Sequence, residues 1–109
     1  MTREFIITPV FDKLWSRLGL TDDDLRDLQI VLMTNPNAGD ILKGTGGARK
    51  TRFALFDAGK SGGIRVIYLD ITHKEQTFLL LCYPKSQQDE LTQEQKKQVK
   101  ALVDTLKGV

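Results

Sequence analysis

Cysteine, histidine and long apolar runs are scarce in this chain. Its 109 residues include one cysteine, Cys82, and one histidine, His73. A single cysteine forms no intramolecular disulfide, so nothing argues for an oxidising compartment. One histidine and one cysteine are also too few ligands for a typical zinc site. No apolar run approaches the roughly 20 residues that cross a bilayer, and the N-terminus lacks a signal-peptide pattern, so we expect a cytoplasmic protein without a membrane partner.

Hydrophobic spacing in the first third of the chain predicts a strand and two helices. Residues 4–8 are largely β-branched and aromatic and end before a proline, which predicts a strand. Apolar residues recur at i, i+3, i+4 and i+7 across 11–18, which predicts a helix that Gly19 ends. Thr21 is an N-cap for a second helix that stops at 35–36. The two helices are expected to form a hairpin.

The remaining spacing predicts three strands and a last helix. The strands are 48–56, 64–71 and 76–83, and their short connections make neighbours antiparallel. A capping box at 92–95 precedes an amphipathic helix that closes the chain. We therefore expect one α+β domain over 1–109. Its small, mostly antiparallel sheet combines the N-terminal strand with the three later strands, and the helical hairpin and the C-terminal helix pack on it.

Basic residues are concentrated in one segment, although the net charge of the chain is only +2. Between Lys43 and Arg65 there are six basic residues and one acid, a local charge of +5. Concentrated positive charge indicates an anion site, and nucleic acid is the commonest large anion in a cell. A solvated basic surface is the alternative that composition alone favours.

Strand alternation predicts that several cationic side chains meet. Lys50 and Arg52 are two residues apart on one strand, so their side chains share a face. Arg65 begins the next strand, and Tyr83 and Lys85 share a face at the end of the last one. Three strands thus bring basic and phenolic groups to one site at the rim of the sheet.

Three other candidate sites fail on spacing or partners. Residues 59–61, Gly-Lys-Ser, invite comparison with a P-loop, but Ala54 stands where that motif needs its first glycine. His73 lies in a polar turn without a second histidine or an evident acidic partner to orient it. Cys82 has no recognisable base and is expected to be a small buried apolar side chain.

Four segments of the chain carry a resemblance to a known family. They are GTGGARKTR at 44–52, GKSGGIRVIY at 59–68, YPKS at 83–86 and DELT at 89–92. Together they resemble the HigB branch of the RelE-type bacterial toxins, over nearly the whole chain. The resemblance implies the small α+β fold and a ribosome-dependent endoribonuclease that cuts messenger RNA in the decoding site.

The resemblance also implies roles for the candidate residues. Arg65 and Arg52 are candidates for binding the scissile phosphate, because a guanidinium donates two parallel hydrogen bonds to its oxygens. Lys50 is a candidate base or charge stabiliser. Tyr83 is a candidate proton donor or stacking partner, and Lys85 a candidate phosphate ligand.

The implied contacts extend beyond the reacting phosphate. Arg49, on the opposite strand face, and Lys60 are candidates for contacting ribosomal RNA. No metal or cofactor is expected, because the RNA 2′-hydroxyl supplies the nucleophile. No histidine matches the position that some RelE-type enzymes use, so the residue that moves the proton stays open. The implied partners are a HigA-like antitoxin with a helix-turn-helix fold, the 70S ribosome with messenger RNA, and operator DNA bound by the toxin–antitoxin complex.

Two other functions stay open at this point. A non-catalytic RNA or ribosome binder, or a decayed toxin, would keep the basic surface without cutting message. A gyrase-inhibiting toxin of the same superfamily is the other, although that branch lacks the arginine, lysine and tyrosine set.

Overall fold

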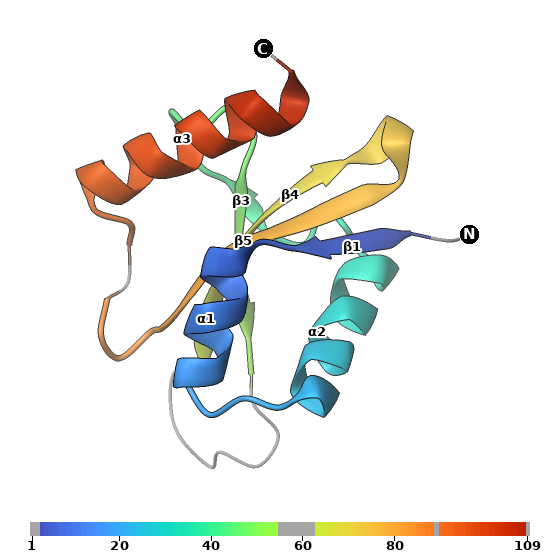
Figure 1. The fold of residues 1–109 in the computed structure, drawn as a ribbon, viewed down its shortest axis with the longest axis vertical. Helices are drawn as coiled ribbons and strands as arrows, with labels where there is room; N and C mark the ends of the chain where they lie inside the picture. The colour runs from blue at the N-terminus through green and yellow to red at the C-terminus, as the bar shows by residue number, and fades with distance from the viewer. Residues whose placement is uncertain (1–2, 55–62, 89, 109) are drawn as a thin grey trace.

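The computed structural model describes residues 3–54, 63–88 and 90–108, in which a five-stranded sheet carries helices on both faces (Figure 1). In chain order the elements are β1 (Glu4–Ile7), α1 (Pro9–Arg17), α2 (Asp22–Thr34), β2 (Asp40–Ile41), β3 (Arg49–Phe53), β4 (Ile64–Ile71), the 3-10 turn η1 (Thr72–Lys74), β5 (Gln76–Pro84) and α3 (Gln93–Lys107). The predicted α+β class, the helical hairpin and the C-terminal helix are confirmed.

The sheet has the strand order β1-β5-β4-β3-β2. β1 pairs with β5 in parallel, and the other neighbouring pairs are antiparallel. The hairpin of α1 and α2 carries the chain from the β1 edge to the opposite edge at β2. β4 and β5 therefore lie inside the sheet, where both of their faces can be covered.

Side-chain caps fix where the helices begin. The Thr8 hydroxyl accepts a hydrogen bond from the Phe11 N–H at 3.2 Å and so caps α1. Thr21 and Asp24 form a capping box at α2, in which each side chain accepts from the other residue's N–H. The predicted box at Thr92 is present at α3 as well.

Two hydrophobic cores lie on the two faces of the sheet. The core under α1 and α2 is formed by Phe11, Trp15, Leu28, Leu32, Phe53, Ile64, Val66, Tyr68, Leu79 and Cys82. The core under α3 is formed by Ala48, Ile67, Leu69, Ile71, Phe78, Leu80, Tyr83, Leu91, Val99 and Val103. The central strands supply side chains to both cores in alternation, as their apolar faces predicted.

The structure differs from the sequence-based expectation in a few places. It adds the short strand β2, and it forms a 3-10 turn where only a polar turn was expected. The strand expected at 48–56 is observed as β3 over Arg49–Phe53. Residues 55–62, with Lys60 and the Gly-Lys-Ser segment, lie outside the described residues. Among the described helices, none has the length and apolar character needed to cross a bilayer.

Candidate functional site

Three candidate residues lie directly opposite one another on adjacent strands. Arg52 on β3 is paired with Arg65 on β4, and Arg65 is paired with Tyr83 on β5. Opposed residues of antiparallel strands have Cβ atoms about 4.5–5.5 Å apart and point to the same face. The register therefore brings two guanidinium groups and a phenol, far apart in sequence, to one row across the sheet.

Lys50 extends this row along β3 on the same face. It lies two residues before Arg52 and opposite Ile67, which belongs to the core under α3. Tyr83 belongs to the same core and is 6% exposed. The set of Lys50, Arg52, Arg65 and Tyr83, called here the rim cluster, thus lies on the α3 side of the sheet.

A close backbone approach at Gly63 shapes the rim beside the cluster. Gly63 has φ +62°, and a Cβ added there would lie 2.6 Å from the Phe53 carbonyl oxygen. The Lys85 N–H donates to the Gly63 carbonyl at 3.2 Å. Only glycine fits this position without strain. Gly63 therefore holds three strand ends together beside the cluster: the end of β3, the start of β4 and the end of β5.

The electrostatics of the cluster favour an anion. Like charges directly opposite each other on a sheet are destabilising, yet Arg52 and Arg65 are paired in this way. Arg52 is exposed, whereas Lys50 and Arg65 are half-buried. An anion placed on this face would offset the repulsion, and a phosphate could accept hydrogen bonds from both guanidinium groups.

A hollow of about 320 Å³ lies beside Tyr83. It is lined by Leu14, Arg17, Leu18, Leu81, Cys82, Tyr83, Pro84, Gln87, Gln88 and Gln95. Its lining does not include the other members of the rim cluster. Arg17 is a cation at this hollow that the sequence analysis missed. Its position in the last turn of α1 has an ordinary explanation as a partner of the helix dipole.

The structure does not bring Arg49 to the rim cluster. Its side chain lies on the hairpin side of the sheet, as alternation predicted, opposite Tyr68. The guanidinium donates a hydrogen bond to the Gly39 carbonyl at 2.7 Å. This contact supports the approach of β2 to β3. The expectation that Arg49 contacts ribosomal RNA stays a prediction.

The other predicted contact residues lie near the rim or outside the described chain. Lys85 is half-buried and follows the last residue of β5, in a turn. Its backbone N–H donates the hydrogen bond to the Gly63 carbonyl. Lys60 falls within residues 55–62, which lie outside the described part of the chain.

The buried Cys82 thiol and Tyr68 phenol offer no catalytic chemistry at neutral pH. Burial raises the pKa of the Cys82 thiol to about 12, so the thiol stays protonated and is a poor nucleophile. Desolvation likewise raises the pKa of the Tyr68 phenol. The expectation that Cys82 is a buried apolar side chain is confirmed.

His73 is exposed in η1, as predicted. This turn follows β4, whereas Arg65 lies near the start of β4. The histidine and the rim cluster therefore occupy opposite ends of the central strands.

Comparison with known proteins identifies the family to which this chain belongs. Residues 6–109 match the model of the family described as "RelE toxin of RelE / RelB toxin-antitoxin system". The fold is similar to that of an E. coli RelE toxin carrying two arginine-to-alanine substitutions, solved in the free state. The TM-score is 0.57 at 18% identity, covering 82% of this chain and 90% of that chain.

A second similar structure is the intact E. coli RelBE toxin–antitoxin complex. Its matching chain has a TM-score of 0.56 at 18% identity, and the match covers 76% of this chain and 96% of that chain. At such identity the structural likeness shows the fold, whereas the family match spans nearly the whole sequence. The chain therefore belongs to the RelE family of toxins from toxin–antitoxin systems.

Proposed function

We propose that this RelE-family toxin is a ribosome-dependent endoribonuclease that cuts messenger RNA at the rim cluster and so inhibits translation. The observation that carries the proposal is the register of Arg52, Arg65 and Tyr83 across three adjacent strands. That row supplies two bidentate phosphate ligands and a phenol on one face. A phosphate bound to this row would accept charge-assisted hydrogen bonds from guanidinium groups.

The proposed reaction uses the RNA as its own nucleophile. The 2′-oxygen attacks the adjacent phosphorus, a new bond forms between them, and the bond from phosphorus to the 5′-oxygen breaks. The 2′-hydroxyl proton leaves to a base, and the departing 5′-oxygen receives a proton. The products are a 2′,3′-cyclic phosphate and a 5′-hydroxyl.

The side chains supply charge, alignment and proton transfer. Arg52 and Arg65 stabilise the negative charge that develops on the phosphorane and hold the phosphate for in-line attack. Lys50 acts as the base or adds positive charge, and Tyr83 donates the proton or stacks on a base. Guanidinium groups provide the stabilising charge, so the proposed mechanism is metal-independent. Lys85 is proposed to bind a neighbouring phosphate.

Substitution of Arg65 tests the proposal. Arg65→Ala should slow message cleavage on purified ribosomes by about 10²–10³-fold, the usual loss when one transition-state donor is removed. Arg26→Ala is the matched control, because that arginine lies on α2 with its side chain 71% exposed. Cleavage by Arg65→Ala at the parental rate would show that the cluster is assigned wrongly. A folded parent that binds ribosomes without cutting message would favour the non-catalytic binder.

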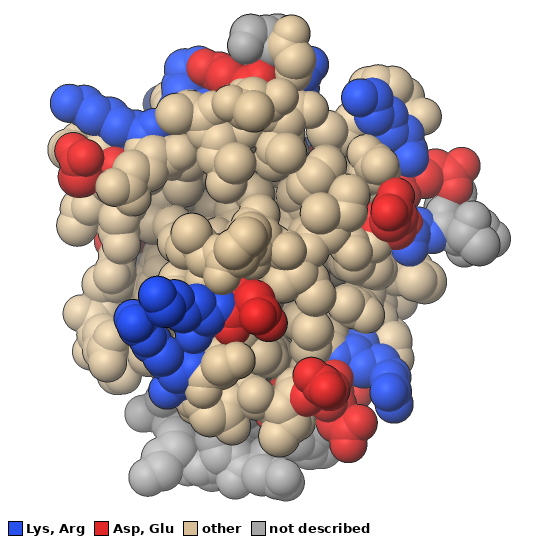
Figure 2. Space-filling model, viewed as in Figure 1, with Lys and Arg blue, Asp and Glu red and all other residues tan. Residues whose placement is uncertain are grey.

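An antitoxin partner is part of the proposed function. The family description and the similar E. coli complex support a partner that masks the toxin. Figure 2 shows a face with an uncharged area at and above its centre; charged side chains surround it, including a group of both signs just below and left of the centre. An apolar hollow of about 370 Å³ is lined by Val10, Leu80, Leu81, Gln98, Val99 and Leu102. We propose that an amphipathic antitoxin helix covers this hollow.

Several finer assignments stay predictions of the sequence. They are the HigB branch, a HigA-like antitoxin with a helix-turn-helix fold, operator DNA as a ligand of the toxin–antitoxin complex, and a cytoplasmic location. Co-purification of the two co-expressed proteins, followed by a mobility-shift assay on the promoter, tests the partner and the DNA.

A further inference from the structure

The hollow beside Tyr83 carries two glutamine side chains that are hydrogen-bonded to each other. It lies among the end of β5, the turn that follows β5, α1 and the first turn of α3. Gln88 lies in the turn and Gln95 in α3, and both are half-buried. The Nε2 of Gln88 donates to the Oε1 of Gln95 at 2.9 Å. These two residues, called here the glutamine pair, therefore form a polar wall of the hollow.

The hydrogen bonds around the glutamine pair fix which way each amide points. The Oε1 of Gln95 also accepts from the Thr92 N–H at 2.9 Å, as part of the capping box. The Nε2 of Gln88 also donates to the Glu90 carbonyl at 2.9 Å. A flip of the first amide would set N–H against N–H, and a flip of the second would set oxygen against oxygen. Each amide therefore has one orientation.

One acceptor and one donor of the pair remain open to a ligand. They are the Oε1 of Gln88 and the Nε2 of Gln95, and among the described residues neither atom takes part in a hydrogen bond. Both atoms reach solvent, because neither is among the buried polar atoms that lack a partner in the described part of the chain. The hollow thus presents a donor and an acceptor in fixed positions.

The remaining lining suits a flat ring. Leu14 and Leu18 of α1 and Leu81 of β5 line the hollow and are half-buried, so they supply apolar contact area. Arg17 of α1 lines it as well, and a guanidinium plane can stack on a base. A volume of about 320 Å³ is near the lower end for small-molecule sites, so the hollow holds one ring system rather than a helix.

We propose that this hollow binds one nucleobase and that the glutamine pair reads its edge. Unstacked bases of single-stranded RNA are recognised by stacking and by hydrogen bonds to their edges. A base edge that presents a donor beside an acceptor matches the two open atoms of the pair. Tyr83 lines the hollow and belongs to the rim cluster, so the base would lie next to the bond that is cut. That last step rests on the proposed function; the binding of a base does not.

Gln95→Glu tests the pair without removing the helix cap. The carboxylate still accepts from the Thr92 N–H and from Gln88, but it replaces the open donor by an acceptor. The altered edge should favour guanine, because guanine presents two adjacent donors, its ring N–H and its amino group.

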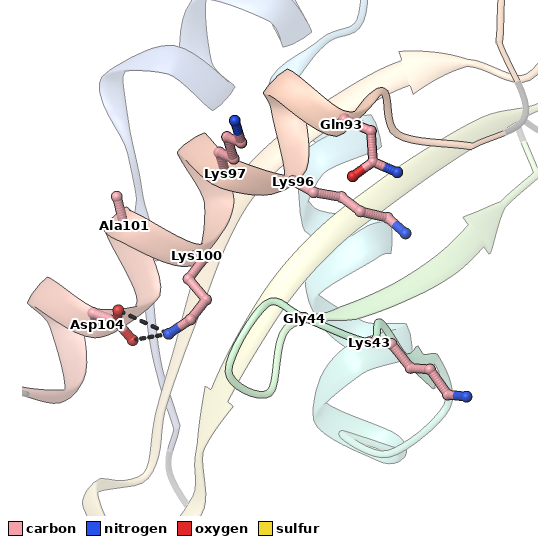
Figure 3. Close-up of a pocket in the computed structure, with 8 residues that line it drawn as sticks. All are labelled: Lys43, Gly44, Gln93, Lys96, Lys97, Lys100, Ala101 and Asp104. Atoms are coloured by element: carbon pink, nitrogen blue, oxygen red, sulfur yellow. Dashed lines mark hydrogen bonds and ion pairs between the residues drawn. The ribbon is translucent and has the colours of Figure 1, made fainter.

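Gln93→Glu is the matched control for the added charge. Gln93 is exposed and lies in the same turn of α3. It lines a separate hollow between α3 and the loop before β3 (Figure 3). The control therefore adds the same negative charge close by and leaves the glutamine pair intact.

Nucleotide binding to the folded protein is measured first, from the side-chain amide signals in NMR spectra. The probes are adenosine 5′-monophosphate, guanosine 5′-monophosphate and ribose 5-phosphate, which lacks a base. In the parent, the nucleotides should shift the amide signals of Gln88 and Gln95, and ribose 5-phosphate should leave them in place. In Gln95→Glu, the affinity ratio of the guanosine to the adenosine nucleotide should rise about 10-fold, as expected of one bidentate pair. Gln93→Glu should keep the parental ratio.

Base preference in cleavage is measured next, on ribosomes that carry defined messages. Gln95→Glu should raise the ratio of cleavage rates beside guanine and beside adenine by a similar factor. Gln88→Met removes the open acceptor and releases Gln95, so it should lower the discrimination among bases.

The outcomes separate this proposal from the proposed function. Amide signals that no nucleotide shifts, or that ribose 5-phosphate shifts equally, would overturn the nucleobase as the ligand. An unchanged base ratio in Gln95→Glu would overturn the role of the glutamine pair. A parent that binds the nucleotides but leaves message intact would uphold the hollow and overturn only the nuclease.

Discussion

Arg52 on β3 and Arg65 on β4 are directly opposed in the sheet, so their side chains leave the sheet from the same face. Cross-strand pairs of like charge reduce the stability of a sheet. Tyr83 continues the row on β5. The arrangement is explained if the row is built for an anion that binds during function rather than for the stability of the free protein.

Removal of the Arg52 guanidinium should therefore slow cleavage without lowering the stability of the fold. Arg52→Gln should change the free energy of unfolding by no more than about 0.5 kcal/mol, because the Arg52 side chain is exposed. The same change should slow message cleavage. Urea unfolding and a ribosome-bound cleavage assay measure the two effects, with Arg26→Gln as the control. A loss of stability together with full cleavage would contradict the assignment.

Removal of the Tyr83 hydroxyl tests the role proposed for the phenol. Tyr83→Phe keeps the aromatic ring but removes the group that could transfer a proton. If the hydroxyl donates the proton, the single-turnover cleavage rate should fall by about 10²-fold or more while ribosome affinity stays the same. Tyr83→Ala should weaken both, since it also removes the ring. A Phe variant that cuts at the parental rate would leave only a stacking role.

The hydroxyl of Tyr68 has a structural role on the other face of the sheet. It donates to the Pro36 carbonyl at 2.8 Å and accepts from the Gly39 N–H at 3.0 Å. Tyr68→Phe leaves both buried backbone groups without this partner. The free energy of unfolding should fall by about 1–3 kcal/mol. Cleavage per folded molecule should be unchanged, and a rate loss beyond the fraction unfolded would contradict the separation of the two faces.

Alkaline pH should destabilise the protein through Cys82. Its pKa rises from an ordinary value of 9.0 to about 12 in the fold because burial disfavours the thiolate. Between these values the unfolded thiol loses its proton while the folded thiol keeps it. The free energy of unfolding therefore falls as pH rises from 9 toward 12.

Cys82→Ala should flatten this dependence without abolishing it. Tyr68, whose pKa is also raised by burial, contributes a loss of the same sign. Urea unfolding midpoints at several pH values between about 8 and 11 provide the measurement. An equally steep fall in the variant would mean that the thiol is not the titrating group.

Most of the fold could be predicted because helix caps and strand alternation depend only on residues that are close in sequence. The N-cap at Thr21, the capping box at Thr92 and the alternation of β4 needed no knowledge of distant residues. Strand β2 was missed because two exposed residues, Asp40 and Ile41, give no periodicity. Their pairing with β3 depends on tertiary contacts, including the Arg49 hydrogen bond to Gly39.

The candidate site was predictable only where it follows from strand alternation. The shared face of Lys50 and Arg52 required the local period of a strand alone. The pairing of Arg52 with Arg65 depends on register, which a sequence does not state directly. The hollow between α3 and the loop before β3 was missed because Lys43 and Lys96 line one space only after the loop packs on α3.

The end groups of the cut RNA show whether the 2′-hydroxyl is the nucleophile. Purified ribosomes carrying a defined message are incubated with the parent or with Arg65→Ala, and the ends of both fragments are determined. We expect a 2′,3′-cyclic phosphate on the upstream fragment and a 5′-hydroxyl on the downstream fragment, with cleavage lost in the variant. Intact message with folded parent protein, or fragments bearing a 5′-phosphate, would contradict it.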